Sequence, residues 1–116
     1  MKLPNAENAV VDIAKLRDYC LNPNHPEGKH KARVFREKLG IGITDAELLR
    51  TWILEAILTE EAREQKPTAY GRRFVVDFNR RVDEQFQYVL SLMTIRSAWI
   101  IRNDEEFPRL TTCFIP

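Results

Sequence analysis

Cysteine and histidine, common ligands of protein metal sites, are scarce in this sequence. Its 116 residues include two cysteines, Cys20 and Cys113, whose spacing predicts neither a zinc framework nor a disulfide scaffold. We interpret both as small core residues. The only histidines, His25 and His30, have no third ligand near them in the chain. P-loop, GxGxxG, HExxH and GxSxG motifs are also absent, so we expect no metal and no cofactor.

Long apolar runs and an excess of one charge are missing as well. No stretch approaches the ~18 apolar residues of a membrane span, and residues 1–5 lack the apolar core of a signal peptide. We therefore expect a cytoplasmic protein with no membrane partner. The 18 basic and 17 acidic residues nearly cancel. A nucleic-acid surface would consequently have to come from local clustering of charge.

What the sequence does have is the composition of a globular domain. Hydrophobic residues make up 44% of the chain and charged residues 30%, values typical of folded domains. No repeat, low-complexity tract or linker-like segment interrupts it. We predict a single domain over residues 1–116 with an ordinary hydrophobic core.

Helical periodicity dominates the first half of the chain. Asp12 is a suitable N-cap for the first helix, and Gly40 is a suitable terminator for the second. Thr44 and Glu47 have the spacing of a capping box that would open the third. We predict three helices, over residues 13–21, 29–39 and 45–58.

The apolar pattern changes to a period of two after residue 70, which predicts strands. Residues 59–68 are polar and contain Pro67, so we interpret them as a fraying helix end and a loop. Residues 80–90 have helical spacing but lie between strands, and we interpret them as a long hairpin connection or a bulged strand start. The expected fold class is α+β, with about three N-terminal helices packed on a C-terminal antiparallel sheet of three to four strands. The predicted strands cover residues 73–78, 92–102 and 110–115.

The start of the second predicted helix is strongly basic. On a helical wheel Lys29, Arg33 and Arg36 fall together, opposite the apolar stripe. One interpretation is a solvated helix face whose lysine stems cover the edge of the core. The other is a phosphate-binding surface formed by Lys29, Lys31 and Arg33. In that case His30 is the proton carrier, since histidine exchanges protons near neutral pH.

A second basic cluster comes from the predicted strands. Arg96 and the hydroxyls of Thr111 and Thr112 come close together if these strands pair in antiparallel order, and Arg73 adds a further positive charge. Arginine beside hydroxyl groups can bind and stabilise a phosphodiester. The alternative is that Arg96 pairs with a carboxylate and that the threonines are present for their strand propensity.

Four segments of the chain are distinctive: LNPNHP (residues 21–26), GKHKARVF (28–35), RSAWII (96–101) and PRLTTC (108–113). Together they resemble an uncharacterised family of small bacterial domains, whose members are stand-alone proteins or modules of polymorphic toxins. The resemblance covers nearly the whole chain.

The order of helices and strands is similar to that of barnase-, colicin- and RelE-like ribonuclease toxins, which act without a metal. This likeness implies that His30 is the acid or base and that Lys31 binds phosphate. It further implies that Arg96 stabilises the transition state while Thr111 or Thr112 orients the phosphate. The candidate catalytic residues are thus His30, Arg96 and Thr112.

Three functions follow as hypotheses. The first is a metal-independent ribonuclease of a toxin–antitoxin or polymorphic toxin system, which would bind RNA and a small cognate antitoxin or immunity protein. The second is a non-catalytic interaction module that docks through Leu92, Ala98 and Ile100 on the second sheet face. The third is an RNA-binding module without chemistry.

Overall fold

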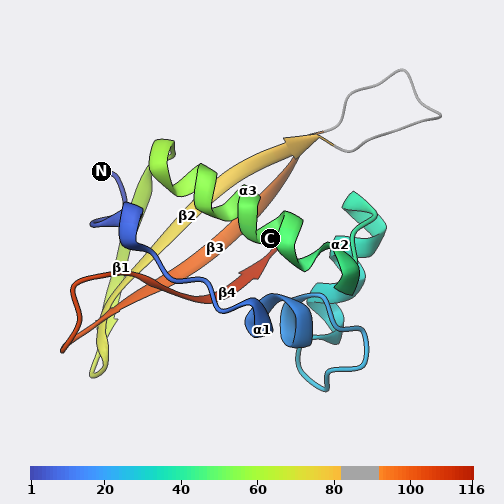
Figure 1. Ribbon diagram of the computed structural model, residues 1–116, viewed down its shortest axis with the longest axis horizontal. Coiled ribbons are helices and arrows are strands. Elements are labelled where there is room, and N and C mark those ends of the chain that lie inside the picture. Colours follow the sequence, from blue (N-terminus) through green and yellow to red (C-terminus); the bar gives the residue numbers. More distant parts are fainter. Residues whose placement is uncertain (82–91) are drawn as a thin grey trace.

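A computed structural model describes residues 1–81 and 92–116 of the chain (Figure 1). Helices occupy its first half and an antiparallel sheet its second, which confirms the predicted α+β class. None of its described helices is long and apolar enough to cross a membrane. The elements are η1 (Ala6–Asn8), α1 (Ile13–Lys15), η2 (Leu16–Cys20), α2 (Lys29–Leu39), η3 (Ile43–Asp45), α3 (Ala46–Thr59), β1 (Ala62–Thr68), β2 (Gly71–Arg81), β3 (Leu92–Arg102) and β4 (Arg109–Phe114).

The four strands follow one another in the order β1-β2-β3-β4, each antiparallel to its neighbour. β2 and β3 pair without interruption from Gly71 opposite Arg102 to Arg81 opposite Leu92. Residues 80 and 81 therefore continue β2, whereas the rest of the ambiguous segment lies outside the described residues. Between β3 and β4 the register shifts after Ala98, which makes Thr111 the extra residue of a bulge.

Strand β1 corrects part of the prediction for residues 59–68, because α3 does end at Thr59 but Ala62–Thr68 form a strand and not a loop. These polar residues have little strand propensity of their own, but they pair with β2, beginning with Ala62 opposite Val76. Pro67 lies where the register shifts between Gln65 and Thr68, in an edge strand that tolerates a missing N–H donor. Pairing with a neighbour, which a local pattern does not show, makes this segment a strand.

The observed helices agree with the predicted ones except at the end of the first helix and the start of the third. α2 has the predicted bounds, and Gly40 follows its last residue as the C-cap in a left-handed conformation with φ of 69°. Asp12 accepts a hydrogen bond from the Ala14 amide, as predicted for an N-cap, but from Leu16 onward the first helix is π-helical. The predicted Thr44 capping box is wrong. The chain enters α3 through the 3-10 turn η3, so the Asp45 carboxylate instead accepts from the Gly42 amide at 2.9 Å.

The core lies between the helices and one face of the sheet. Figure 1 shows α3 crossing the sheet over β2 and β3, with α1 and α2 near the end of β4. Trp99 is buried on this face, and its indole N–H donates to the buried Ser97 hydroxyl at 2.9 Å. Arg96 and Ala98 alternate with these residues and are only partly buried on the opposite face. Cys20 and Cys113 are buried in the core as predicted, and burial raises the pKa of both thiols.

Candidate phosphate-binding groove

The turn before α2 fixes the position of the first turn of this helix, which carries the basic side chains. Gly28 packs so closely on η2 that a Cβ atom there would lie 2.1 Å from the Tyr19 carbonyl oxygen. The Nδ1 atom of His25 accepts hydrogen bonds from the Glu27 and Gly28 amides at 3.0 and 2.9 Å. The His25 ring also meets the Tyr19 ring edge-on, with centroids 4.8 Å apart. His25 is therefore a structural residue that holds the start of α2.

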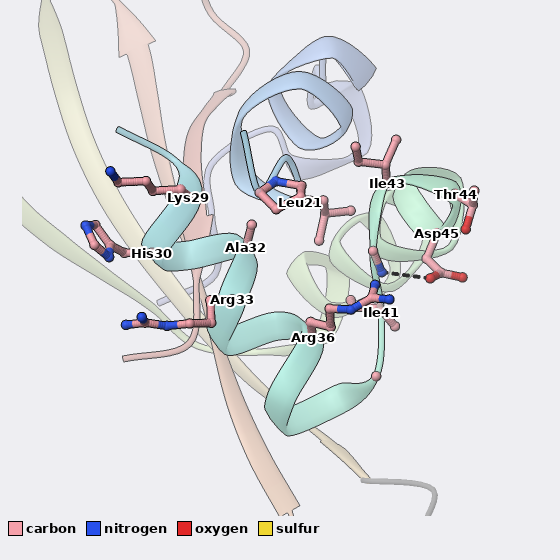
Figure 2. Close-up of a pocket in the computed structure, with 13 residues that line it drawn as sticks. Leu21, Lys29, His30, Ala32, Arg33, Arg36, Ile41, Ile43, Thr44 and Asp45 are labelled. Atoms are coloured by element: carbon pink, nitrogen blue, oxygen red, sulfur yellow. Dashed lines mark hydrogen bonds between the residues drawn. The ribbon is translucent and has the colours of Figure 1, made fainter. Parts of the chain in front are cut away.

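A groove of roughly 890 Å³ lies between α2 and the segment that leads into α3. In Figure 2, Lys29, His30 and Arg33 leave α2 on one side, whereas Arg36 extends toward the segment that carries Ile41 and Asp45. Apolar side chains complete the groove between these two walls. The lining residues are Leu21, Pro23, Lys29, His30, Ala32, Arg33, Arg36, Gly40, Ile41, Gly42, Ile43, Thr44 and Asp45.

Three basic residues of the groove have no anionic partner among the described residues. Within residues 1–81 and 92–116, no ion pair involves Lys29, Arg33 or Arg36. This holds even though Glu37 stands four positions after Arg33 on α2, a spacing that permits pairing. The lining includes one carboxylate, Asp45, which already accepts from the Gly42 amide. The groove is thus a locally positive site on a nearly neutral protein.

Lys31, predicted to bind phosphate, points to a different place. Its ammonium group hydrogen-bonds to the Tyr19 hydroxyl at 2.8 Å and lies 4.7 Å from the centroid of the same ring. The Phe114 ring of β4 lies 5.8 Å away from it. Lys31 therefore ties α2 to η2 and β4, and it is not among the residues that line the groove.

Arg96 forms a bidentate ion pair on the open face of the sheet. Its Nε and Nη2 atoms donate to the two carboxylate oxygens of Asp77 at 2.9 and 3.0 Å, and Arg63 donates to the same carboxylate at 3.2 Å. These cations, Arg96 foremost, lower the pKa of Asp77. Pairing with a carboxylate was one of the two interpretations of Arg96, and it is the one that describes this structure.

The other predicted strand residues also lie away from the groove. Arg73 is exposed in β2, opposite Gln65 on one side and Ile100 on the other. The Thr111 hydroxyl donates to the Ala98 carbonyl at 3.1 Å, and the Thr112 hydroxyl lies 3.9 Å from the Cys20 sulfur. The structure therefore brings together Lys29, His30 and Arg33, but leaves Lys31, Arg73, Arg96, Thr111 and Thr112 outside the groove.

The chain matches a family described as a domain of unknown function, DUF6883, over residues 2–116. It belongs to DUF6883. This membership confirms the resemblance to an uncharacterised domain family, while association with toxins stays a prediction. Searches among curated proteins and among solved structures found no match for this DUF6883 domain.

Part of the groove was not anticipated from the sequence. Arg36 shares the wheel position of Lys29 and Arg33, so helical spacing already marked it, although it was not among the predicted site residues. No sequence pattern predicted the wall over residues 40–45, because only packing of the chain brings it opposite α2. In the described part of this DUF6883 domain, no group of three or more His, Cys, Asp or Glu residues could hold a metal ion.

Proposed function

We propose that this DUF6883 domain binds RNA in the α2 groove and cleaves it as a metal-independent ribonuclease. The observation that carries the proposal is that Lys29, His30 and Arg33 line one groove and leave α2 on the same side, without a carboxylate partner among the described residues. Positive side chains that no ion pair neutralises are suited to phosphodiesters, whose contacts dominate nucleic-acid affinity. Such an enzyme would act in the cytoplasm and would require a cognate antitoxin or immunity protein.

His30 is the proton carrier of the proposed reaction. It is exposed at the groove and has no hydrogen-bond partner among the described residues, whereas His25 is committed to two backbone amides. His30 takes the proton of a ribose 2′-hydroxyl as that oxygen attacks the adjacent phosphorus. The bond from phosphorus to the 5′ oxygen breaks, and the imidazolium returns the proton to this leaving oxygen. Lys29 and Arg33 stabilise the charge on the phosphate.

Cleavage of total bacterial RNA by the pure protein in EDTA tests this proposal. We expect wild-type protein to cut RNA and His30→Ala to lower the rate by about 100-fold or more. Arg73→Gln is the matched control, because Arg73 is an exposed cation outside the groove, and its rate should equal that of wild type. Intact RNA with all three proteins would contradict the ribonuclease proposal. RNA retention that weakens with salt, without cleavage, would instead indicate a binding module.

The open sheet face favours a second candidate, a non-catalytic interaction module. Leu92 is 59% exposed, and Ala98 and Ile100 are partly buried on the face opposite α3. A protein partner could cover these side chains. Light scattering tests this candidate, since a dimer or a stable complex that Ile100→Asp dissociates would support it. A lone monomer that captures no partner would count against it.

A further inference from the structure

The α2 groove has a basic side and an apolar side. Lys29, His30 and Arg33 form the basic side, whereas Arg36 extends toward the other side. On the other side, Ile43 is 41% exposed, although it is a large hydrophobic residue. The exposed Pro23 lies in the same lining, and the floor includes the buried Leu21, Ala32 and Ile41. A phosphate group alone makes no use of such an apolar side.

We infer that the groove holds an unpaired nucleotide of single-stranded RNA, with its base against the apolar side and its phosphate on the basic side. This inference rests on the proposed function and names the substrate class. In a duplex the bases are stacked inside the helix, so a protein contacts mainly the phosphates and sugars. An unpaired base can instead leave the stack and pack on an apolar surface. A groove of roughly 890 Å³ is within the ordinary range for small-molecule sites.

Asp45 supports this orientation of the nucleotide. It is the carboxylate of the groove lining and lies on the side toward which Arg36 extends, away from Lys29 and His30. Asp45 offsets the charge of Arg36 there, so a phosphate is attracted more strongly by Lys29 and Arg33. The amino and imino groups of a base are hydrogen-bond donors, which a carboxylate accepts. Charge therefore places the phosphate near Lys29 and Arg33 and the base near Ile43 and Asp45.

Fluorescence anisotropy with a labelled 2′-O-methyl RNA tests the inference, because this RNA lacks the attacking hydroxyl and stays intact. The probe is used as a single strand and after annealing to its complement. We expect the wild-type protein to bind the single strand about ten-fold more tightly than the duplex. Ile43→Ala should weaken single-strand binding about five-fold, since it removes apolar contact with the base, and should leave duplex binding unchanged.

Leu48→Ala is the matched control for Ile43→Ala. Leu48 is 44% exposed on α3, similar to Ile43, but it is not part of the groove lining. This variant should bind both probes like wild type. Equal wild-type affinity for both forms would overturn the unpaired-nucleotide inference while leaving RNA binding in place. An equal loss with Leu48→Ala would overturn the location of the base, and no binding of either probe would overturn the proposed function as well.

Discussion

Three arginines of the sheet differ from those of α2 in having a carboxylate that neutralises them. Each donates to both oxygens of its partner, in the pairs Arg72–Glu64, Arg96–Asp77 and Arg109–Glu105. No such pair involves Arg33 or Arg36 in the part of the chain that the structure describes. Register brings one of these pairs together, because antiparallel pairing places Asp77 directly opposite Arg96, whereas Glu105 stands only four residues before Arg109.

This comparison shows that the number of basic residues in a segment does not locate an anion site. Both regions are rich in arginine, but Arg72, Arg96 and Arg109 of the sheet already donate to carboxylates. A phosphate would have to displace these partners before it could bind there. Arg33 and Arg36 have no carboxylate partner to displace among residues 1–81 and 92–116, so the groove should dominate binding of an anion.

The largest expected effect comes from removing the unpaired charges. Arg33→Gln combined with Arg36→Gln should weaken RNA binding by about 10- to 100-fold at low salt, and should reduce the slope of log affinity against log salt by about 1.4. A salt titration of RNA binding measures both quantities. The control is Arg72→Gln combined with Arg109→Gln, which removes two paired sheet arginines. If this control loses as much affinity, the contrast between the two regions is wrong.

A smaller effect should separate the two histidines. His25→Ala leaves the Glu27 and Gly28 amides without their acceptor, so the free energy of unfolding should fall by about 1–2 kcal/mol. His30→Ala removes an exposed side chain and should change it by less than about 0.5 kcal/mol. Urea denaturation monitored by circular dichroism measures both variants. Equal stability of the two variants would contradict the structural role of His25.

The smallest effect concerns the ion pair on the open sheet face. Arg96 and Arg63 lower the pKa of Asp77, so the pair stabilises the fold fully above the ordinary aspartate pKa of about 3.9. That contribution disappears as the pH falls through the lower, folded-state pKa. Asp77→Asn should therefore cost about 1 kcal/mol of unfolding free energy at pH 6 and progressively less toward pH 2. Urea denaturation at several pH values checks this, and a deficit that stays constant with pH would exclude the ion pair as its source.

Elements that are set by the residue pattern of their own segment were predicted correctly, whereas elements that depend on other parts of the chain were not. The bounds of α2 (Lys29–Leu39) and β3 (Leu92–Arg102) were predicted correctly, because apolar periodicity and Gly40 are properties of the segment itself. β1 (Ala62–Thr68) was missed, since its polar residues become a strand only by pairing with β2. The cap of α3 was misplaced because a 3-10 turn, η3, precedes the helix.

The candidate site shows the same division. Lys29, His30 and Arg33 were predicted together, because they lie within five residues at the start of one predicted helix. The structure places all three in the lining of one groove. Arg96 was predicted to join them, but it lies on the sheet face opposite the helices and pairs with Asp77. Which face of a sheet is covered depends on packing, and a strand pattern shows only which residues share a face.

The sequence by itself determined the α+β class, most of the elements and the basic character of α2, since periodicity, capping residues and charge are local. Tertiary structure decided whether Arg96 and the α2 arginines meet a carboxylate among the described residues. Cross-strand register brought Asp77 to Arg96, and chain packing placed residues 40–45 opposite α2 to form the groove. Contacts between residues far apart in the chain are set by the packing of the whole domain, and no short segment contains them.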